Sequence, residues 1–128
     1  MNVIQIAPAQ MSRYEDAHLH LGSEPRSVRL DSRPIRLGRK EYDLLTVLVR
    51  HAGEVVGRKT LLMLVWGYSP EIRTRTLDVH IRKLRSKLGR YSTQYIETIF
   101  GVGYRFQPYR EPRAFDKPAF EQALAAGA

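Results

Sequence analysis

The sequence predicts an α+β domain, in which a small antiparallel β-meander precedes three helices and a β-hairpin. Three observations support this fold class: apolar residues alternate over residues 18–37, the apolar spacing becomes helical from residue 39, and extended, glycine-punctuated sequence returns after residue 89. The chain has 128 residues, 43% of them hydrophobic, which is enough for one domain with its own core. We expect an N-terminal tail over residues 1–17, the domain over 18–108 and a C-terminal tail over 109–128.

The meander is predicted from a two-residue period. Breaks rich in Gly, Pro and Ser, at residues 22–25 and 31–34, divide the alternating segment into three short strands. Antiparallel strands of this kind commonly bury one face and expose the other. The residues that form the expected apolar face are Leu19, Leu21, Val28, Leu30, Ile35 and Leu37.

Three helices follow. The first begins at Arg39 and ends before Gly53, and the second covers residues 58–67. The third covers residues 74–88, with Thr74 as the expected N-cap and Gly89 as the stop. At about 100° per residue, its apolar side chains form one narrow seam that must pack against the other two helices. This seam consists of Leu77, Ile81, Leu84 and Leu88.

A hairpin over residues 95–107 completes the domain. Its two apolar runs flank Gly101-Val102-Gly103, which predicts a tight turn. Two helices joined by a loop and followed by a hairpin form a helix-turn-helix with a wing. The predicted fold is therefore a winged helix-turn-helix.

Charge indicates the class of partner. Lys and Arg number 21 against 13 Asp and Glu, for a formal net charge of +8, which is typical of proteins that bind a polyanion. The absence of cysteine excludes disulfide scaffolds, thiolate zinc sites and thiol nucleophiles. No apolar run is long enough to span a membrane, and the N-terminus lacks the pattern of a secretory signal. We therefore expect a cytoplasmic protein without membrane partners.

The side of the third helix opposite its seam, called here the outer face, has the composition of a DNA-reading surface. The only acid in the helix is Asp78, near its beginning. Lys or Arg can donate to guanine in the major groove, and an exposed valine can contact a thymine methyl group. Arg85 and Lys87, beside the outer face, would contact phosphates. An ordinary solvated basic face remains the alternative. The outer face consists of Arg75, Thr76, Val79, Arg82, Lys83 and Ser86.

Three separated segments carry a resemblance to a known family. "LGRKEYDLLTVLVRHAGEVVGRKTLLMLVWGY", "RTLDVHIRKLRSKLG" and "IETIFGVGYRF" resemble the winged-helix effector domain of OmpR/PhoB-type response regulators. The resemblance implies that Val79 and Lys83 face bases, and that the wing tip, with Phe100 and Arg105, lies at the adjacent minor groove. It also implies a loop that can contact RNA polymerase and a protein that can pair on tandem half-sites. The implied backbone contacts are Arg75, Thr76, His80, Arg82, Arg85, Thr98 and Tyr104, and the implied polymerase loop is Tyr68, Ser69, Pro70, Glu71 and Ile72.

The sequence also departs from that family. Phe100 stands where the family usually has a basic residue, so electrostatic reading of a narrow minor groove is not expected. Gly38 and Gly57 stand where Ser or Thr commonly cap the first two helices. The segment before the meander is too short for a receiver domain, so we expect a stand-alone regulator or an excised domain.

No other chemistry is predicted. His18 and His20 share one face of a strand, but without cysteine or a further clustered histidine they are expected to be surface residues, so we expect no metal and no cofactor. No spacing suggests a catalytic triad or carboxylate pair, and we expect no enzyme activity. The main hypothesis is a sequence-specific regulator that binds double-stranded DNA. The alternatives are a protein-interaction module that contacts RNA polymerase and a non-specific nucleic-acid binder.

Overall fold

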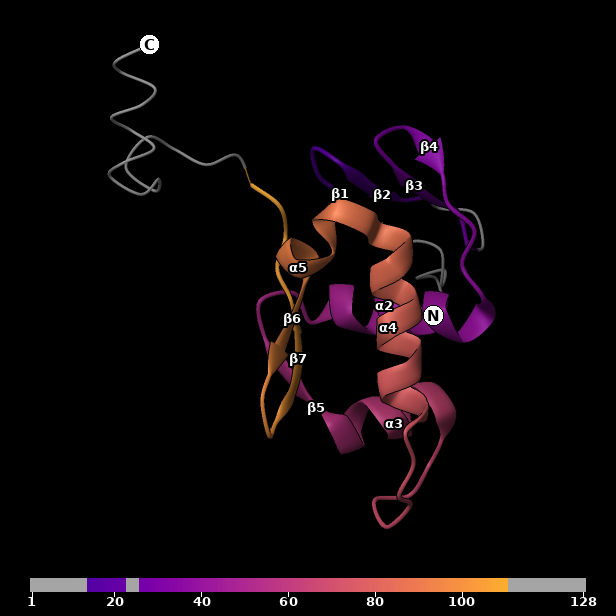
Figure 1. Ribbon diagram of the computed structural model, residues 1–128, viewed down its shortest axis with the longest axis vertical. Helices are drawn as coiled ribbons and strands as arrows, with labels where there is room; N and C mark the ends of the chain where they lie inside the picture. The colour runs from indigo at the N-terminus through magenta and orange to yellow at the C-terminus, as the bar shows by residue number, and fades with distance from the viewer. Residues whose placement is uncertain (1–13, 23–25, 111–128) are drawn as a thin grey trace, which may run out of the picture.

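A computed structural model describes residues 14–22 and 26–110 of the chain. Helix α4 crosses α2, a four-stranded sheet covers one end of this pair, α3 lies at the other end, and a three-stranded sheet lies along the side (Figure 1). The elements are β1 (Tyr14–Glu15), β2 (Leu19–Leu21), β3 (Val28–Leu30), β4 (Arg33–Pro34), α2 (Arg39–Arg50), β5 (Val55–Gly57), α3 (Arg58–Trp66), α4 (Thr76–Leu88), the 3-10 turn η2 (Gly89–Tyr91), α5 (Ser92–Tyr95), β6 (Ile96–Ile99) and β7 (Gly103–Phe106). The predicted α+β winged helix-turn-helix is confirmed.

The first sheet is the predicted meander, with strand order β1-β2-β3-β4 and antiparallel neighbours. Leu19 faces Leu30 and Leu21 faces Val28 across β2 and β3. The last strand is shorter than expected, because β4 ends at Pro34, although the backbone N–H of Ile35 still donates to the carbonyl oxygen of Val28 at 3.0 Å. Leu37 is nevertheless buried, beyond the strand.

Both ends of the domain extend into segments that the sequence assigned to tails. Tyr14 and Glu15 form β1, and the Tyr14 ring packs edge-on against Phe106 at 5.4 Å. At the other end, the backbone N–H of Tyr109 donates to Asp16 at 3.2 Å. The boundaries predicted at 17/18 and 108/109 therefore cut through packed residues, whereas residues 1–13 and 111–128 lie outside the described part.

Asp16 joins the first sheet to the end of the chain's packed part. Its carboxylate accepts hydrogen bonds from the hydroxyls of Tyr14 and Tyr95, the latter at 2.7 Å, and from the backbone of His18 and Leu19. Burial alone would raise the pKa of Asp16, but these hydrogen bonds stabilise the charged form and lower the pKa overall. This cluster of hydrogen bonds fixes the meander against α5.

The three helices share one core with both sheets. All four residues of the predicted α4 seam are buried, and Leu77, Leu84 and Leu88 are completely inaccessible. The α4 helix begins two residues later than predicted, at Thr76, and Thr74 accepts a hydrogen bond from the Thr76 backbone N–H at 3.1 Å. The α2 helix begins after Gly38, whose backbone N–H donates to Glu41 at 3.1 Å.

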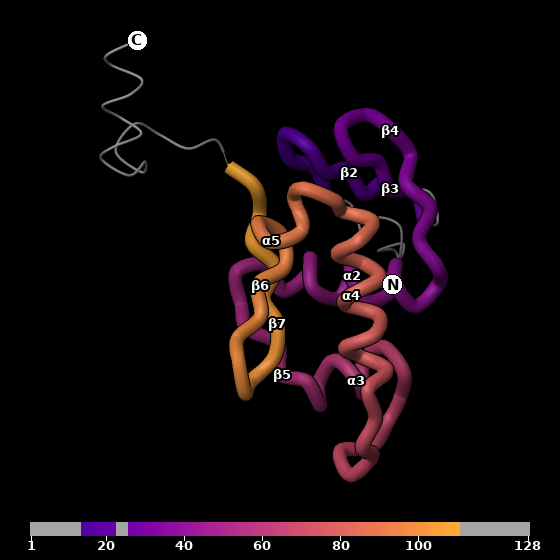
Figure 2. Tube along the Cα trace, viewed as in Figure 1, coloured from indigo at the N-terminus to yellow at the C-terminus, as the bar shows by residue number. Residues whose placement is uncertain are grey.

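The predicted hairpin is present, and the short extended segment before α3 joins it as a third strand. The strand order is β5-β7-β6, with Gly57 opposite Gly103 and Val56 opposite Tyr104. A Cβ atom on Gly103 would lie 2.0 Å from the carbonyl oxygen of Val56, so only glycine allows the two strands to approach this closely. The wing is consequently tied to the beginning of α3. The trace in Figure 2 shows β5 running alongside the hairpin before it enters α3.

Candidate nucleic-acid interface

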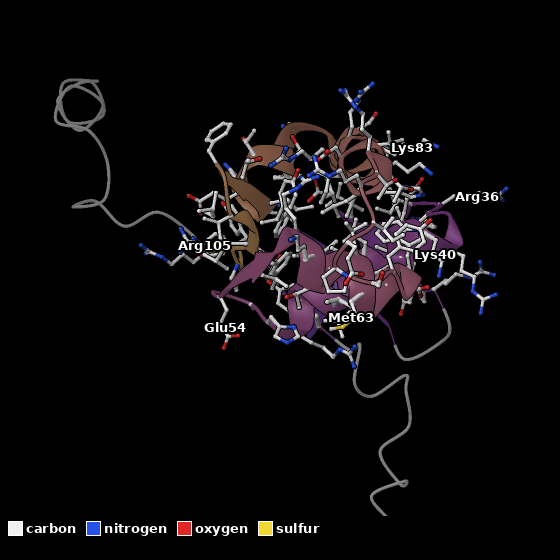
Figure 3. All side chains as sticks on the ribbon, turned by 90° about the horizontal axis from the view of Figure 1, so that it is seen from below. Arg36, Lys40, Glu54, Met63, Lys83 and Arg105 are labelled. Atoms are coloured by element: carbon white, nitrogen blue, oxygen red, sulfur yellow. The ribbon has the colours of Figure 1, made fainter. Side chains whose placement is uncertain are left out.

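The outer face of α4 is accessible, as the buried seam on its other side requires. Val79 is 37% exposed, and Arg82, Lys83 and Ser86 are also exposed. Lys83 projects away from the body of the protein, on the opposite side from Met63 (Figure 3). The two residues expected to face bases, Val79 and Lys83, thus lie where a groove of DNA could reach them.

His80 lies at the margin of this face and is held in place by two neighbours. Its Nδ1 atom lies 2.8 Å from the backbone carbonyl oxygen of Thr76, and its ring packs edge-on against Trp66 at 5.0 Å. A carbonyl oxygen can only accept, so Nδ1 carries a proton. In the neutral ring Nε2 then has only a lone pair, and His80 can donate to a phosphate only when it is protonated.

Arg85 is held against the wing. Its terminal nitrogen donates to the carbonyl oxygen of Ile96 and to the hydroxyl of Thr98, each at 2.8 Å. Its guanidinium also lies over the ring of Tyr104, 5.7 Å from the centroid. Arg85 and Thr98 therefore connect α4 to the wing, and the phosphate contact expected of Arg85 stays a prediction.

Tyr104 is also not a surface group. Only 7% of it is exposed, and its hydroxyl donates to Asp78 Oδ1 at 2.9 Å. Burial raises the pKa of Tyr104, and the hydrogen bond to Asp78 raises it further. The Tyr104 hydroxyl is thus bonded inside the protein, and its expected contact with the DNA backbone stays a prediction.

Asp78 receives a second partner from α3. Arg58 donates to both of its carboxylate oxygens, and this interaction lowers the pKa of Asp78. The sequence placed Asp78 at the helix start only as a favourable partner of the helix dipole. Its main contacts instead join α4 to α3 and the wing, which neutralises the one acid of the helix.

Lys87 is occupied in the same way. Its Nζ atom donates to the carbonyl oxygen of Arg36 at 2.7 Å and lies 3.0 Å from Oε1 of Glu41, which is buried. Burial would raise the pKa of Glu41, but Lys87 and the Gly38 N–H lower it. Lys87 thus fixes the end of α4 on α2, and the expectation that it contacts phosphates is not supported.

The wing tip consists of Phe100, Gly101 and Val102. Phe100 is 90% exposed and Val102 is 52% exposed, and Gly101 has a φ of +79°, a conformation that favours glycine. Arg105, expected at the tip, lies instead in β7 and donates to Glu97 of β6 at 2.8 Å. Figure 3 shows Arg105 and Lys83 on different sides of the molecule. Alternation along β7 places Arg105 on the opposite face of the sheet from the buried Tyr104, and its register places it beside Glu97.

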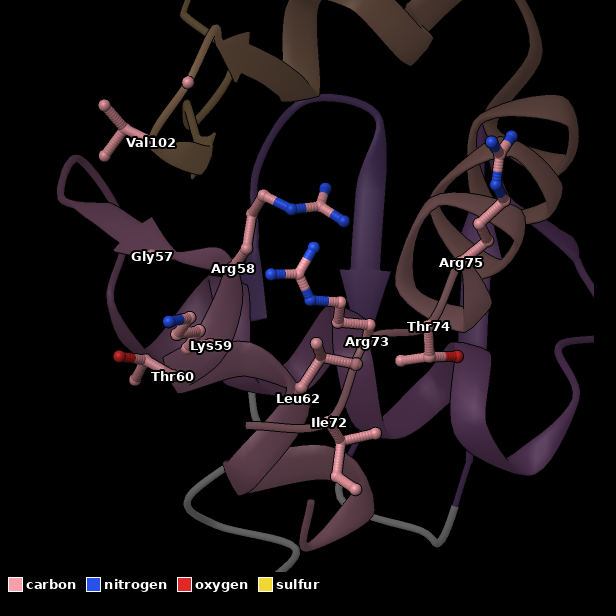
Figure 4. A pocket seen from close by; sticks show the side chains of 11 residues that line it. Gly57, Arg58, Lys59, Thr60, Leu62, Ile72, Arg73, Thr74, Arg75 and Val102 are labelled. Carbon is pink, nitrogen blue, oxygen red and sulfur yellow. The ribbon is translucent and has the colours of Figure 1, made fainter. Parts of the chain in front are cut away.

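A groove between the wing and the loop before α4 carries cations that the sequence analysis did not include. We call it the cationic groove (Figure 4). Lys59 and Arg73 are exposed, and neither was predicted, because the groove forms from three segments that are distant in sequence. The basic pairs in "GRK" and "RTR" were the available signal. The groove is lined by Arg58, Lys59, Arg73 and Arg75, with Gly57, Thr60, Leu62, Ile72, Thr74, Gly101 and Val102.

The loop expected to contact RNA polymerase connects α3 to α4 at one end of the molecule. Ser69, Pro70, Glu71 and Ile72 are exposed, Ile72 by 48%, and Tyr68 is half-buried against the core. On the adjacent helix, Met63 and Leu64 are 51% and 49% exposed. This end of the molecule therefore presents apolar side chains to solvent.

Other site types find no support in the described residues. Over residues 14–22 and 26–110, no group of three or more His, Cys, Asp or Glu side chains could hold a metal ion. Nδ1 of His18 lies 2.6 Å from Asp31, and His20 lies near Glu15. Within the same residues, no helix has the length and apolarity needed to cross a bilayer.

Comparison with known proteins agrees with the geometry. A family model described as "Transcriptional regulatory protein, C terminal" matches residues 32–106, which is more than half of the chain. The transcriptional regulatory protein SrrA of Staphylococcus aureus is 36% identical over 120 residues, covering 91% of this chain and 48% of SrrA. The chain thus spans about half the length of the curated relatives it matches.

Two solved structures support the same family. The DNA-binding domain of Klebsiella pneumoniae RstA, solved in complex with the RstA box, is 31% identical with a TM-score of 0.67, covering 75% of this chain and 97% of that domain. The response regulator DrrB, a Thermotoga maritima OmpR/PhoB homologue, is 32% identical with a TM-score of 0.67, covering 75% of this chain and 44% of DrrB. The chain belongs to the family of transcriptional regulatory protein C-terminal domains, the OmpR/PhoB-type winged helix-turn-helix effector domains.

Proposed function

We propose that this protein is a transcription regulator that binds double-stranded DNA in a sequence-specific manner, with α4 in the major groove. Val79 and Lys83 contact base edges, and Arg75, Thr76, Arg82 and protonated His80 contact the sugar-phosphate backbone. The observation that carries the proposal is the outer face of α4, which presents cations and one apolar side chain on a helix anchored by a buried seam.

The alternative of an ordinary solvated face is less consistent with the contacts of Asp78. A solvated helix commonly mixes exposed charges of both signs. Here both oxygens of Asp78 are used by Arg58, so that the acid compensates a cation of α3 instead of the outer face. The positive charge on Arg82 and Lys83 therefore remains available to a polyanion.

The wing and the cationic groove extend the same surface. Gly101 and Val102 line the groove together with Arg58 and Arg73 (Figure 4), so a phosphate strand that leaves the major groove would pass between α4 and the wing. The relative RstA was solved bound to its DNA box, which supports the class of partner. On tandem half-sites, two copies of the protein would bind side by side.

Selection of bound duplexes from a random pool tests the proposal directly. We expect one preferred motif, and affinity for it that falls steeply with salt, by about 0.9 log units per log unit of salt for each phosphate neutralised. Equal recovery of all sequences would instead indicate a non-specific nucleic-acid binder. A salt-independent affinity would contradict the electrostatic interface.

A second candidate function rests on the exposed apolar side chains near the loop over residues 68–72. We propose that this end of the molecule contacts RNA polymerase while α4 holds DNA. Met63 lies on the opposite side of the molecule from Lys83 of the outer face, so both contacts are sterically compatible (Figure 3). Met63→Ser, at an exposed position outside the cationic groove, should reduce polymerase recruitment in a transcription assay without changing DNA affinity. A parallel loss of both would contradict a separate polymerase contact.

A further inference from the structure

Phe100 at the wing tip is a large aromatic side chain that the fold leaves in solvent. It is 90% exposed, whereas Phe106 on the same hairpin is completely buried. Burying such a ring against a partner is strongly favourable. The ring is therefore available for a contact that the isolated domain does not make.

The backbone around Phe100 is held in a fixed position. The Val102 N–H donates to the carbonyl oxygen of Ile99 at 2.9 Å and closes the turn, and the Val102 carbonyl oxygen accepts from the backbone N–H of Arg58 at 3.0 Å. The hydrogen bonds of Arg85 to β6 then tie the hairpin to α4. The direction in which the tip points, relative to the outer face of α4, is thereby fixed before any ligand binds.

The surroundings of the tip indicate what it meets. The two residues that follow Phe100 line the cationic groove with Arg58, Lys59, Arg73 and Arg75. A protein partner with an apolar pocket for Phe100 would also place the rim of that pocket against these cations, so it would need acidic groups there. A nucleic acid satisfies both requirements, because phosphates would occupy the groove while the flat faces and sugars of the nucleotides would accept the ring.

We propose that Phe100 is an apolar wedge that enters the minor groove and partly unstacks one base-pair step. This inference rests on the proposed function and adds a determinant of sequence preference to it. The turn residues Phe-Gly-Val-Gly contain no cation, and Arg105 is paired with Glu97, so the tip has no charged group to place in a narrow groove.

The wedge has a specific consequence for the DNA that the protein prefers. Inserting an aromatic ring requires the minor groove to widen and the duplex to bend toward the major groove. Pyrimidine–purine steps such as TA and CA deform easily, whereas A-tracts are stiff with a narrow minor groove. We therefore expect Phe100 to select a deformable step beneath the wing and to disfavour an A-tract there, without forming a hydrogen bond to any base.

The test uses three duplexes that share the motif recovered by selection and differ only under the wing, where they carry a TA step, a CA step or an A-tract. Binding and end-to-end bending, followed by fluorescence energy transfer, are measured for the natural protein, Phe100→Ala, Phe100→Arg and Lys83→Ala. We expect Phe100→Ala to lose about tenfold in affinity on the TA duplex and little on the A-tract, as partial burial of one ring predicts. Bending should decrease, and Phe100→Arg should reverse the preference toward the A-tract.

The outcomes separate this inference from the proposed function. If Phe100→Ala binds and bends all three duplexes like the natural protein while Lys83→Ala weakens binding, the wedge is wrong and the major-groove contact stands. If Phe100→Ala weakens binding only on tandem sites and not on a single half-site, the ring contacts a second protein copy, which also overturns the wedge. If the natural protein binds no duplex, both proposals fail. Thermal unfolding of Phe100→Ala should match that of the natural protein, because the ring is exposed.

Discussion

Arg58, the first residue of α3, holds Asp78 in the first turn of α4 through two parallel hydrogen bonds of 2.5 and 3.0 Å. The same carboxylate accepts a hydrogen bond from Tyr104 of the wing. One acid thus connects the two helices of the helix-turn-helix with the hairpin that follows them. The spacing between the outer face of α4 and the wing tip depends on this three-way contact.

Replacing Asp78 with Asn should destabilise the protein. Asn cannot receive the paired donation from Arg58, and Tyr104 loses a charged acceptor in a buried position, so we expect a loss of about 1–3 kcal/mol in the free energy of unfolding. Urea denaturation measures this change. Glu54→Gln, at an exposed position, is the matched control and should be neutral. Equal stability of the two variants would show that the Asp78 contacts contribute nothing to folding.

Replacing Lys83 with Ala should remove a base contact. We expect a cost of about 1–3 kcal/mol on the preferred motif and a relaxed preference at one base position. Competition binding with single-base variants of the motif measures both effects. Arg50→Ala, at the end of α2, removes one exposed positive charge elsewhere and should preserve the preference at every position. A uniform loss on all duplexes would assign Lys83 to the backbone instead.

Replacing Arg85 with Ala should lower the stability of the folded protein. The variant loses two hydrogen bonds to β6 and the contact with the Tyr104 ring, so its melting temperature should fall. Part of this cost is offset, because Nε of Arg85 is buried and has no hydrogen-bond partner among the described residues. An unchanged melting temperature together with weaker DNA binding would show that Arg85 leaves the wing to contact phosphate.

Replacing Gly103 with Ala should separate β5 from β7. The added Cβ would overlap the carbonyl oxygen of Val56, a backbone atom that cannot move without breaking the strand pairing, and we expect a loss of about 2 kcal/mol or more. Gly57→Ala is the natural control, since its nearest neighbour would lie at an ordinary 3.8 Å. If both variants melt at the same temperature, the close approach of the two strands does not constrain the fold.

Stability should also fall in acid because of Asp16. Its pKa is lower in the folded protein than in the unfolded chain, where it is about 3.9, so the carboxylate contributes stability above that pH and loses its contribution as pH falls through the folded pKa. We expect the melting temperature to decrease below about pH 5. Asp16→Asn should be less stable at neutral pH and show a flatter decrease in acid. A decrease of identical steepness in both proteins would exclude Asp16 as a source.

The apolar pattern of the sequence was sufficient to predict the fold. Leu77, Ile81 and Leu84 fix which side of α4 is buried, and the opposite side follows from helical geometry alone. Strand β5 escaped the prediction as part of the sheet because three residues carry too little periodicity. Its pairing with β7 depends on Gly103, and the close approach of the two strands at this glycine is visible only in the folded structure.

The polar contacts of the site were harder to predict. Arg85 and Lys87 have the same charge as Arg82 and Lys83, yet they turn inward to acceptors supplied by β6 and by Glu41. Long basic side chains can follow an apolar surface to a distant partner, so position on a helical wheel does not determine where the charge ends. The cationic groove likewise required the folded arrangement of α3, the α3–α4 loop and the wing.

The hydrogen bond between Asp16 and the Tyr109 backbone brings β1 close to the segment that follows β7. Both lie at the end of the molecule opposite α3 (Figure 1). A biotin or a chip linker introduced near either Tyr14 or Tyr109 would consequently attach the domain at the end opposite α3. Immobilised in this way, the protein would offer α4 and the wing unobstructed to a flowing analyte, a practical orientation for a label-free sensor of promoter sequences.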